Sequence, residues 1–240
     1  MSWQHLVFVS VFMAAMFALS IILGKRNRNK TDAQKNVVLI WSAILIDGFE
    51  LFKIILNCAV DPSAWRVMLP LFLCSIQLIA IPLAAFSKGR IKDAALDFVC
   101  IFGLLGAILG TCGAAQNYNA YPVLSFPNVV SAITHSISGF ASLYIMLSGM
   151  ASMKRENIWI TFAILIFFCI TAYIANVVLD YNYMFLMAGD GTPYDILFNL
   201  VNGHHVLYPV CVVALFLVYI CLFYAGTFLV KKKKKQPVAV

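Results

Sequence analysis

Charged residues are scarce in this chain of 240 residues: Asp, Glu, Lys and Arg make up 11% of it, against 62% hydrophobic residues. A water-soluble globular domain carries about 25% charged residues, so the composition excludes that class of protein. The chain also lacks the alternation of polar and apolar residues that a membrane-spanning β-strand needs, and its apolar runs are continuous. The sequence therefore indicates an all-α membrane protein.

Metal-binding motifs are missing as well. None of the seven cysteines is spaced as Cys-x-x-Cys, and most stand alone in apolar stretches, as free core cysteines do. Cys58 and Cys112 are the exception. Both fall near helix ends that are predicted below to face the outside of the membrane, so they could form a disulfide; two free thiols are the alternative. The adjacent His204 and His205 point different ways on any regular element. We therefore predict no metal and no cofactor.

Seven apolar stretches of about 20 residues, the length of a membrane-spanning helix, are present. They lie near 4–24, 37–59, 67–87, 94–112, 128–150, 157–179 and 206–230. The first has no basic n-region and is longer than a signal-peptide core, so it is expected to be retained. We predict one domain of seven transmembrane helices over residues 1–230 and a basic tail over 231–240. Internal repeats are absent, which argues against an inverted-repeat transporter.

The basic residues predict the orientation. Fifteen of the 17 fall on one side of the seven spans, and by the positive-inside rule that side is cytoplasmic. They are Lys25, Arg26, Arg28, Lys30, Lys35, Lys88, Arg90, Lys92, Lys154, Arg155 and Lys231 to Lys235. The N-terminus is then outside and the C-terminus cytoplasmic. The net charge of +7 reflects this topology, so we predict no nucleic-acid partner and expect the Lys231–Lys235 run to attract anionic lipid headgroups.

Four polar side chains, Asp47, Glu50, Lys53 and Asn57, follow one another at spacings of three and four in the second stretch. Such spacings place them on neighbouring positions of one helix face. A charge inside the membrane costs about 2.5 to 3.5 kcal/mol, so these side chains are expected to face the bundle interior. We predict an ion pair between Glu50 and Lys53. A pair that only fixes helix packing is the alternative.

A thiol, an imidazole and an ammonium group are predicted to lie at one depth. Cys74, His135 and Lys53 are each eight residues from the outer boundary of their stretch, or about 12 Å at 1.5 Å per residue. Four more polar residues lie just above or below that depth: Glu50, Gln77, Asn57 and Asn176. The cytoplasmic halves of the same stretches are almost purely apolar. The pattern predicts a polar layer that opens outward inside the bundle.

Within this layer, Cys74 and His135 are the residues that could act as a nucleophile and a base. A thiol in an apolar interior needs a base within hydrogen-bond reach before it attacks an ester. His135 could take that proton and return it to a leaving alcohol, with Asn176 orienting the ring. Phospholipid ester carbonyls lie near this depth. We therefore predict acyl transfer from lipid through a thioester on Cys74.

Three short motifs carry a family resemblance. Leu69–Cys74 (Leu-Pro-Leu-Phe-Leu-Cys), Phe126-Pro127 ahead of His135, and Asn182–Leu186 (Asn-Tyr-Met-Phe-Leu) together resemble the bacterial YwaF-like integral membrane proteins. An animal enzyme that transfers polyunsaturated acyl chains onto ether lysophospholipids is similar to that family. The resemblance implies a bundle of six or seven helices in a bacterial plasma membrane, with membrane phospholipid as substrate.

The same resemblance matches Cys74 to the family's cysteine and His135 to its histidine. Phe72 departs from the pattern, which has His before the Leu-Cys pair. The residues expected to bind or orient substrate are Glu50, Lys53, Asn57, Gln77, Asn176, Asn182 and Tyr183. A transporter or small-ligand receptor with an outward polar cavity is the alternative function, and a structural membrane protein with a well-packed polar interior is a third.

Overall fold

The computed structural model describes residues 2–112 and 121–235, and the side chains of Cys112 and of 232–235 lie outside that description. Every helix or strand assigned within those ranges is an α- or 3₁₀-helix, so the predicted all-α class is confirmed. The chain divides into two compact units, Met1–Ser152 and Met153–Val240, and each is described by itself. A single bundle over 1–230 stays a prediction.

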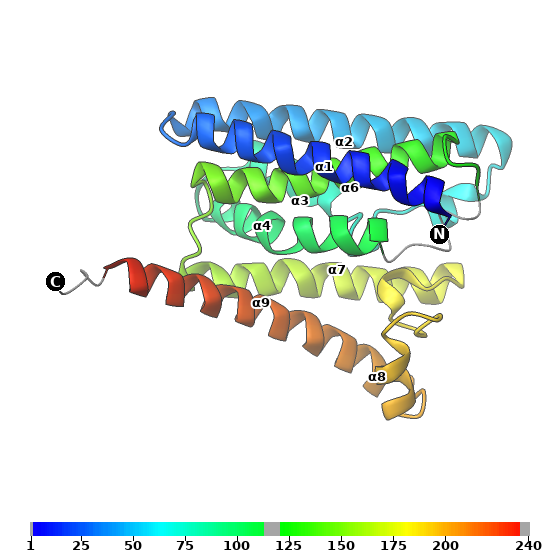
Figure 1. Ribbon diagram of the computed structural model, residues 1–240. Helices are drawn as coiled ribbons and strands as arrows, with labels where there is room; N and C mark the ends of the chain where they lie inside the picture. The colour runs from blue at the N-terminus through cyan, green and yellow to red at the C-terminus, as the bar shows by residue number, and fades with distance from the viewer. Residues whose placement is uncertain (1, 113–120, 236–240) are drawn as a thin grey trace. The chain divides into compact units, whose positions relative to one another are not determined.

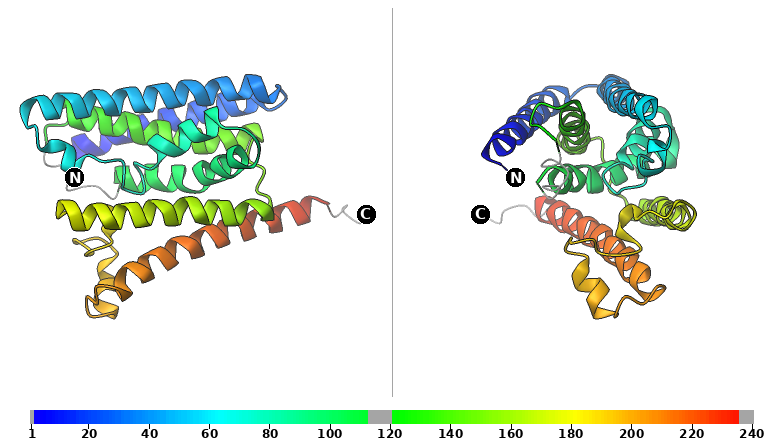
Figure 2. Two further views of the ribbon diagram at one scale, coloured as in Figure 1. Left: turned by 180° about the vertical axis from the view of Figure 1, so that it is seen from behind. Right: turned by 90° about the vertical axis from the view of Figure 1, so that its right-hand side faces the viewer.

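The first unit is built around a ring of four helices. Its elements are α1 (Trp3–Asn27), α2 (Asp32–Val60), η1 (Ala64–Val67), α3 (Gln77–Phe86), α4 (Gly89–Cys112) and α6 (Phe126–Ser148). Helix α2 packs on α3, α3 on α4, α4 on α6 and α6 on α2, which closes the ring, while α1 packs on α6 (Figures 1 and 2). Side chains that face inward from these four helices therefore meet.

Local signals explain where these helices begin and end. Helix α2 starts with a capping box, in which the Thr31 hydroxyl accepts from the Gln34 N–H and the Gln34 side chain accepts from the Thr31 N–H. Pro127 fills the first turn of α6, where a missing N–H does no harm, and Gly149 ends that helix at φ 76°. After α2, Asp61 accepts from the hydroxyl and the N–H of Ser63, and these hydrogen bonds lower the pKa of its carboxyl group.

The helix expected over 67–87 is not continuous, which corrects the sequence prediction. The chain forms the 3₁₀-helix η1, passes through irregular turns, and becomes α-helical only at Gln77. Pro70 is the physical reason, since it has no N–H to donate and disfavours helical backbone at Leu69. The Leu71 N–H turns back to the Leu69 carbonyl at 2.7 Å instead. Cys74 therefore lies on an irregular segment that leads into a short helix.

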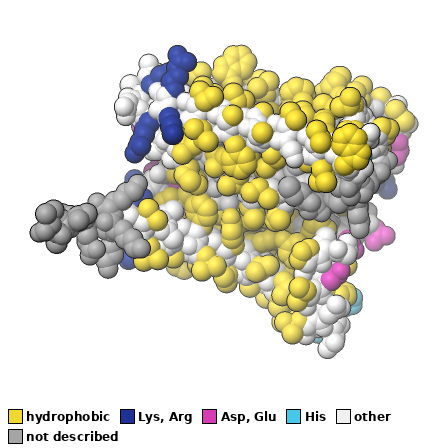
Figure 3. Space-filling model, viewed as in Figure 1, with side chains coloured by type: hydrophobic (Ala, Val, Ile, Leu, Met, Phe, Trp, Pro, Cys, Tyr) yellow, Lys and Arg dark blue, Asp and Glu magenta, His cyan; other side chains and the backbone are white. Residues whose placement is uncertain are grey.

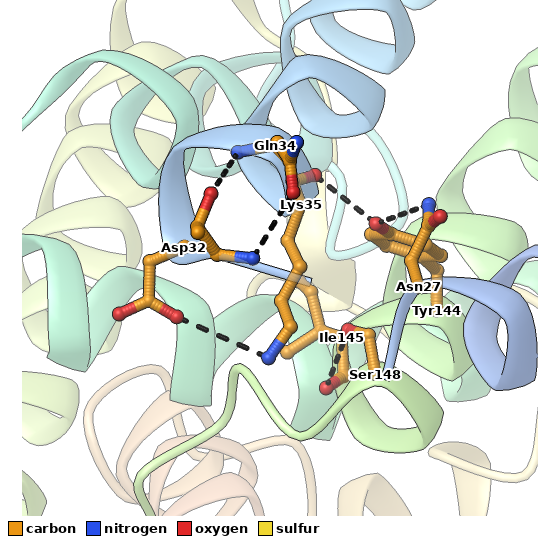
Figure 4. Close-up of polar contacts among 8 residues, drawn as sticks. Asn27, Asp32, Gln34, Lys35, Tyr144, Ile145 and Ser148 are labelled. Carbon is orange, nitrogen blue, oxygen red and sulfur yellow. Dashed lines mark hydrogen bonds and ion pairs between the residues drawn. The ribbon is translucent and has the colours of Figure 1, made fainter. Parts of the chain in front are cut away.

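A cluster of hydrogen bonds joins α1, α2 and α6 at the end of the unit that carries the α1–α2 connection (Figure 4). The Asn27 amide donates to the Tyr144 hydroxyl at 3.0 Å, and that hydroxyl donates to the Lys35 carbonyl at 3.1 Å. Lys35 also pairs with Asp32 at 3.9 Å. Asn27, Asp32 and Lys35 belong to the connection between the predicted spans 4–24 and 37–59. The three helices are thus held together there by polar groups that satisfy one another.

The second unit comprises η2 (Arg155–Asn157), α7 (Ile158–Leu179), η3 (Tyr183–Phe185), α8 (Asp195–Leu200) and α9 (Leu207–Lys235). Helix α7 packs on α9 and on η3. The Thr161 and Tyr224 hydroxyls lie 3.2 Å apart between α7 and α9. Helix α9 continues through the basic run to Lys235, so that run extends the last helix; the side chains of 232–235 lie outside the described residues, and the predicted attraction to lipid stays a prediction.

The surface of the described helices suits a lipid environment. Five of them are long and apolar enough to span a membrane: Trp3–Asn27, Gly89–Thr111, Phe126–Ser148, Arg155–Leu179 and Leu207–Lys231. Trp41, Phe52 and Ile55 on α2 are more than half exposed. Figure 3 shows hydrophobic side chains over one face of the molecule, with Lys and Arg of the α1–α2 connection gathered at one end. The protein is a membrane protein, whereas seven spans and their orientation stay predictions.

Candidate functional site

An ion pair on α2 supplies the first wall of the site. The Lys53 Nζ lies 2.5 Å from the Glu50 Oε1. The relative solvent exposure of the side chain is 20% for Lys53 and 12% for Glu50. The predicted pair is therefore confirmed. Asn57, expected to bind substrate, instead donates its amide to the Lys53 carbonyl one turn back, at 2.8 Å. That contact satisfies the amide within its own helix.

Cys74 comes to the site from the irregular segment before α3. Its sulfur lies 3.9 Å from the Ser75 hydroxyl and beside the Ser75 backbone amide. Its backbone rests on α4 at Gly106, where an added Cβ would stand 3.1 Å from the Cys74 Cα and 3.3 Å from its Cβ. A glycine is what lets the irregular backbone approach α4 so closely. The Cys74 backbone is thus held against the α4 surface.

His135 comes to the site from α6 in a defined tautomer. Its Nδ1 lies 2.8 Å from the Ser131 carbonyl oxygen, which can only accept a hydrogen bond, so Nδ1 carries the proton. The Ser131 hydroxyl is 3.2 Å from the same nitrogen. Nε2 then presents its lone pair and has no hydrogen-bond partner in the described parts of the chain. The imidazole is oriented as a base.

The His135 ring rests on α4 one turn from Cys74. An added Cβ at Gly110 would overlap the imidazole at Nε2, and Gly110 is four residues, or about 6 Å, beyond Gly106 on the same face of α4. Helix α6 and the segment before α3 therefore bring His135 and Cys74 to adjacent turns of α4.

Unpartnered polar atoms occur at this site. Gln77, three residues after Cys74, is fully buried, and neither its oxygen nor its nitrogen has a hydrogen-bond partner among the residues described. One carboxylate oxygen of Asp47, a turn before Glu50, and the Thr111 hydroxyl, next to Gly110, are also buried without a partner. The polar groups that join α1, α2 and α6, in contrast, are all used. Unpartnered polar atoms therefore lie within three residues of Cys74, Glu50 and Gly110 in the chain.

Three predicted site residues belong to the second unit, where they organise a loop. The Asn176 side chain accepts from the Tyr183 N–H at 2.6 Å and donates to the Tyr183 carbonyl at 3.0 Å. Asn182 donates to the Ala188 carbonyl at 2.8 Å and accepts from the Met187 N–H at 2.9 Å. Tyr183 is fully buried. The role of orienting His135, expected of Asn176, is filled in the first unit by the Ser131 carbonyl.

Within the described ranges no three of His, Cys, Asp and Glu gather as metal ligands would. His204 accepts from the Val206 and Leu207 N–H groups at 3.3 Å and so caps the start of α9. Cys58 is a free thiol, and the Cys112 side chain lies outside the described residues.

Two features of the site were missed by sequence reasoning. Gly103, Gly106 and Gly110 predict a packing face, but the sequence does not say that Cys74 and His135 are what packs on Gly106 and Gly110. The second feature is the Ser131 carbonyl. Every residue has a backbone carbonyl, so the sequence cannot indicate which one accepts the hydrogen bond from His135.

Comparison with known proteins places the chain in a family. The chain matches no curated protein and no solved structure. A family model described as the TMEM164 family matches residues 1–234. That match spans nearly the whole chain, and the protein therefore belongs to the TMEM164 family.

Proposed function

We propose that this protein is an acyltransferase embedded in the membrane, which uses Cys74 as nucleophile and His135 as base. The observation that carries the proposal is that the Cys74 backbone and the His135 imidazole rest on adjacent turns of one glycine face of α4. The second support is the tautomer of His135, in which Nε2 carries the lone pair that a base needs. Nucleophile, base and a group that orients the base are the parts that covalent acyl transfer requires.

The reaction needs two steps and no cofactor. In the first, His135 Nε2 takes the Cys74 proton, the sulfur attacks the ester carbonyl of a phospholipid, and the carbon–oxygen bond breaks; the leaving alcohol receives the proton from His135. In the second, His135 takes the proton of an acceptor alcohol, whose oxygen attacks the thioester. The new ester leaves, and the proton returns to the thiol.

Membrane phospholipid suits the site as a substrate. The exposed apolar side chains of α2 face the environment in which acyl chains are held, and the Glu50–Lys53 pair brings a cation near the reacting groups. The resemblance to YwaF-like proteins and to the animal ether-phospholipid enzyme favours the same chemistry and a bacterial plasma membrane.

Activity-based labelling tests the proposal. Membranes that contain the wild-type protein are treated with an acyl or fluorophosphonate probe, and labelling is followed by gel. We expect labelling in wild type, its loss in Cys74→Ala and His135→Ala, and its retention in Cys58→Ala, a matched loss of one free thiol on α2. Equal labelling of wild type and both site variants would remove the proposal.

One observation favours a transporter or ligand receptor as the second candidate. Backbone that is not helical at membrane depth is tolerated where it is buried in protein or lines a cavity, and transporters place substrates at such breaks. The segment before Gln77 is a break of this kind, near the Glu50–Lys53 pair. A transporter requires Glu50 and Lys53 but not the thiol, so solute flux into proteoliposomes that survives Cys74→Ser would favour it.

A further inference from the structure

Gln77 is the most conspicuous unused group of the first unit. Its relative exposure is 0%, and both atoms of its amide lack a hydrogen-bond partner within residues 2–112 and 121–235. A buried amide that bonds to nothing is unfavourable, and most buried polar groups in proteins have a partner. An amide kept in this state is one that a bound molecule can satisfy.

The backbone brings this amide close to the Cys74 thiol. The Ile76 N–H donates to the Phe72 carbonyl at 2.9 Å, and the Leu78 N–H donates to the Ser75 carbonyl at 3.0 Å. The segment is therefore already coiled into turns where it passes Cys74 and joins α3. Residues three apart in such a coil lie about 5–6 Å from each other at Cβ, which is within reach of a long amide side chain.

The start of α3 adds a favourable field. Helix α3 has ten residues, begins at Gln77 and has no side-chain cap. The first turn of a helix carries a partial positive charge from its aligned N–H groups, and it stabilises a negative charge placed nearby. Cys74 lies directly before this end of α3. A negative charge that develops on a group bonded to the Cys74 sulfur would lie in this field.

We propose that the Gln77 amide is the oxyanion-stabilising donor of the acyl-transfer site. Its nitrogen donates to the carbonyl oxygen of the bound acyl group, and this hydrogen bond strengthens as the sulfur attacks and the oxygen becomes anionic. Gln77 is then a catalytic residue, because it touches the reacting atoms. This inference rests on the proposed function, since it assigns the carbonyl-binding part of the same site.

Two reagents that attack the same thiol separate this role from a structural one. Acylation of Cys74 by p-nitrophenyl decanoate passes through an oxyanion. Methyl methanethiosulfonate modifies the thiol by attack at its divalent sulfur, which forms a mixed disulfide and releases methanesulfinate, so no tetrahedral oxyanion forms on a carbonyl carbon. The purified full chain in lipid nanodiscs is treated with each reagent, and the Cys74 peptide is followed by mass spectrometry over time. The variant is Gln77→Met, which keeps the volume and removes the donor.

The matched control is Ser87→Ala. Ser87 lies at the other end of α3, and its buried oxygen also lacks a partner among the residues described. We expect Gln77→Met to slow acylation of Cys74 by about 10²- to 10³-fold, the effect of losing one oxyanion donor, with thiosulfonate modification unchanged. Ser87→Ala should leave both rates unchanged.

Three results would overturn the inference. Acylation of Gln77→Met at the wild-type rate would show that the amide does not assist, and an equal fall in both rates would show that Gln77 only shapes access to the thiol. In either case wild-type acylation of Cys74 would leave the proposed function standing. If thiosulfonate modifies wild-type Cys74 but the ester never does, the proposed function and this inference fall together.

Discussion

At the scale of single residues, the site depends on how each side chain is held. His135 is a base because a backbone carbonyl fixes the proton on its other ring nitrogen. Cys74 lies one turn of α4 from the base because glycine at 106 lets the irregular segment approach α4. Glu50 and Lys53 neutralise each other, so this pair contributes a dipole rather than a net charge.

Removing one member of the ion pair is predicted to be worse than removing both. Lys53→Met leaves the Glu50 carboxylate mostly buried without its cation. We expect a loss of about 2–3 kcal/mol, below the roughly 3–5 kcal/mol of a fully buried pair because both groups keep some exposure. The double variant Glu50→Gln, Lys53→Met should recover most of it. Thermal unfolding in detergent measures both, and equal losses in the single and double variants would contradict the pairing.

Residue-level prediction from the sequence succeeded where spacing within one helix decides the contact. Glu50 and Lys53 are three apart, so their pairing follows from helix geometry alone. It decides nothing for Asn176, because Asn176 and His135 are far apart in the chain and spacing does not say what an amide will bond, so its role in orienting His135 stays a prediction. The sequence likewise gives no reason to single out the Ser131 carbonyl from the other carbonyls of α6.

At the scale of elements, α4 is the surface on which the site is assembled. Its glycines receive the Cys74 backbone at Gly106, the His135 ring at Gly110 and the α6 backbone at Gly103. A continuous third helix would carry its side chains at fixed angles of 100°, whereas the break before Gln77 frees the thiol segment from that constraint. The break could not be read from hydropathy, because Leu69–Ile76 is as apolar as the helix that follows it.

Filling the α4 surface is predicted to displace the base. In Gly110→Ala the new methyl group overlaps the His135 imidazole, so the ring must move. We expect a loss of about 1–3 kcal/mol in stability, typical of overpacking, and loss of Cys74 labelling by the acyl probe. The measurements are thermal unfolding and probe labelling.

Gly48→Ala is the control for Gly110→Ala, because Gly48 lies within α2 with nothing inside 4 Å of an added Cβ. Alanine there should keep labelling and leave stability unchanged or raised by up to about 1 kcal/mol, the helix propensity gained. Labelling in Gly110→Ala at the wild-type level would argue against the placement of His135 on that glycine.

At the scale of the whole molecule, the apolar runs predicted most of the helices, because transfer of about 20 apolar residues into lipid dominates their energetics. Five of the seven predicted spans correspond to helices that are long and apolar enough. The division into two compact units was not predicted, since the sequence shows no linker or change in composition at residue 152.

The orientation of the chain gives a prediction at this scale. Arg28 and Ser63 are exposed residues of successive connections, and the distribution of Lys and Arg places the first in the cytoplasm and the second outside. A membrane-impermeant maleimide applied to intact cells should therefore label Ser63→Cys above the parent protein and label Arg28→Cys only after permeabilisation. The reverse pattern would invert the topology and place the site toward the cytoplasm.

The most direct test of the acyltransferase is the covalent intermediate itself. The protein is incubated in phospholipid vesicles without an acceptor alcohol. The reaction is then quenched in acid, the protein is digested, and the mass of the Cys74 peptide is measured by mass spectrometry. The account predicts a peptide heavier by one acyl group, sensitive to hydroxylamine as a thioester is, and absent in His135→Ala. An unmodified Cys74 peptide in the wild-type protein, or equal acylation in His135→Ala, would contradict it.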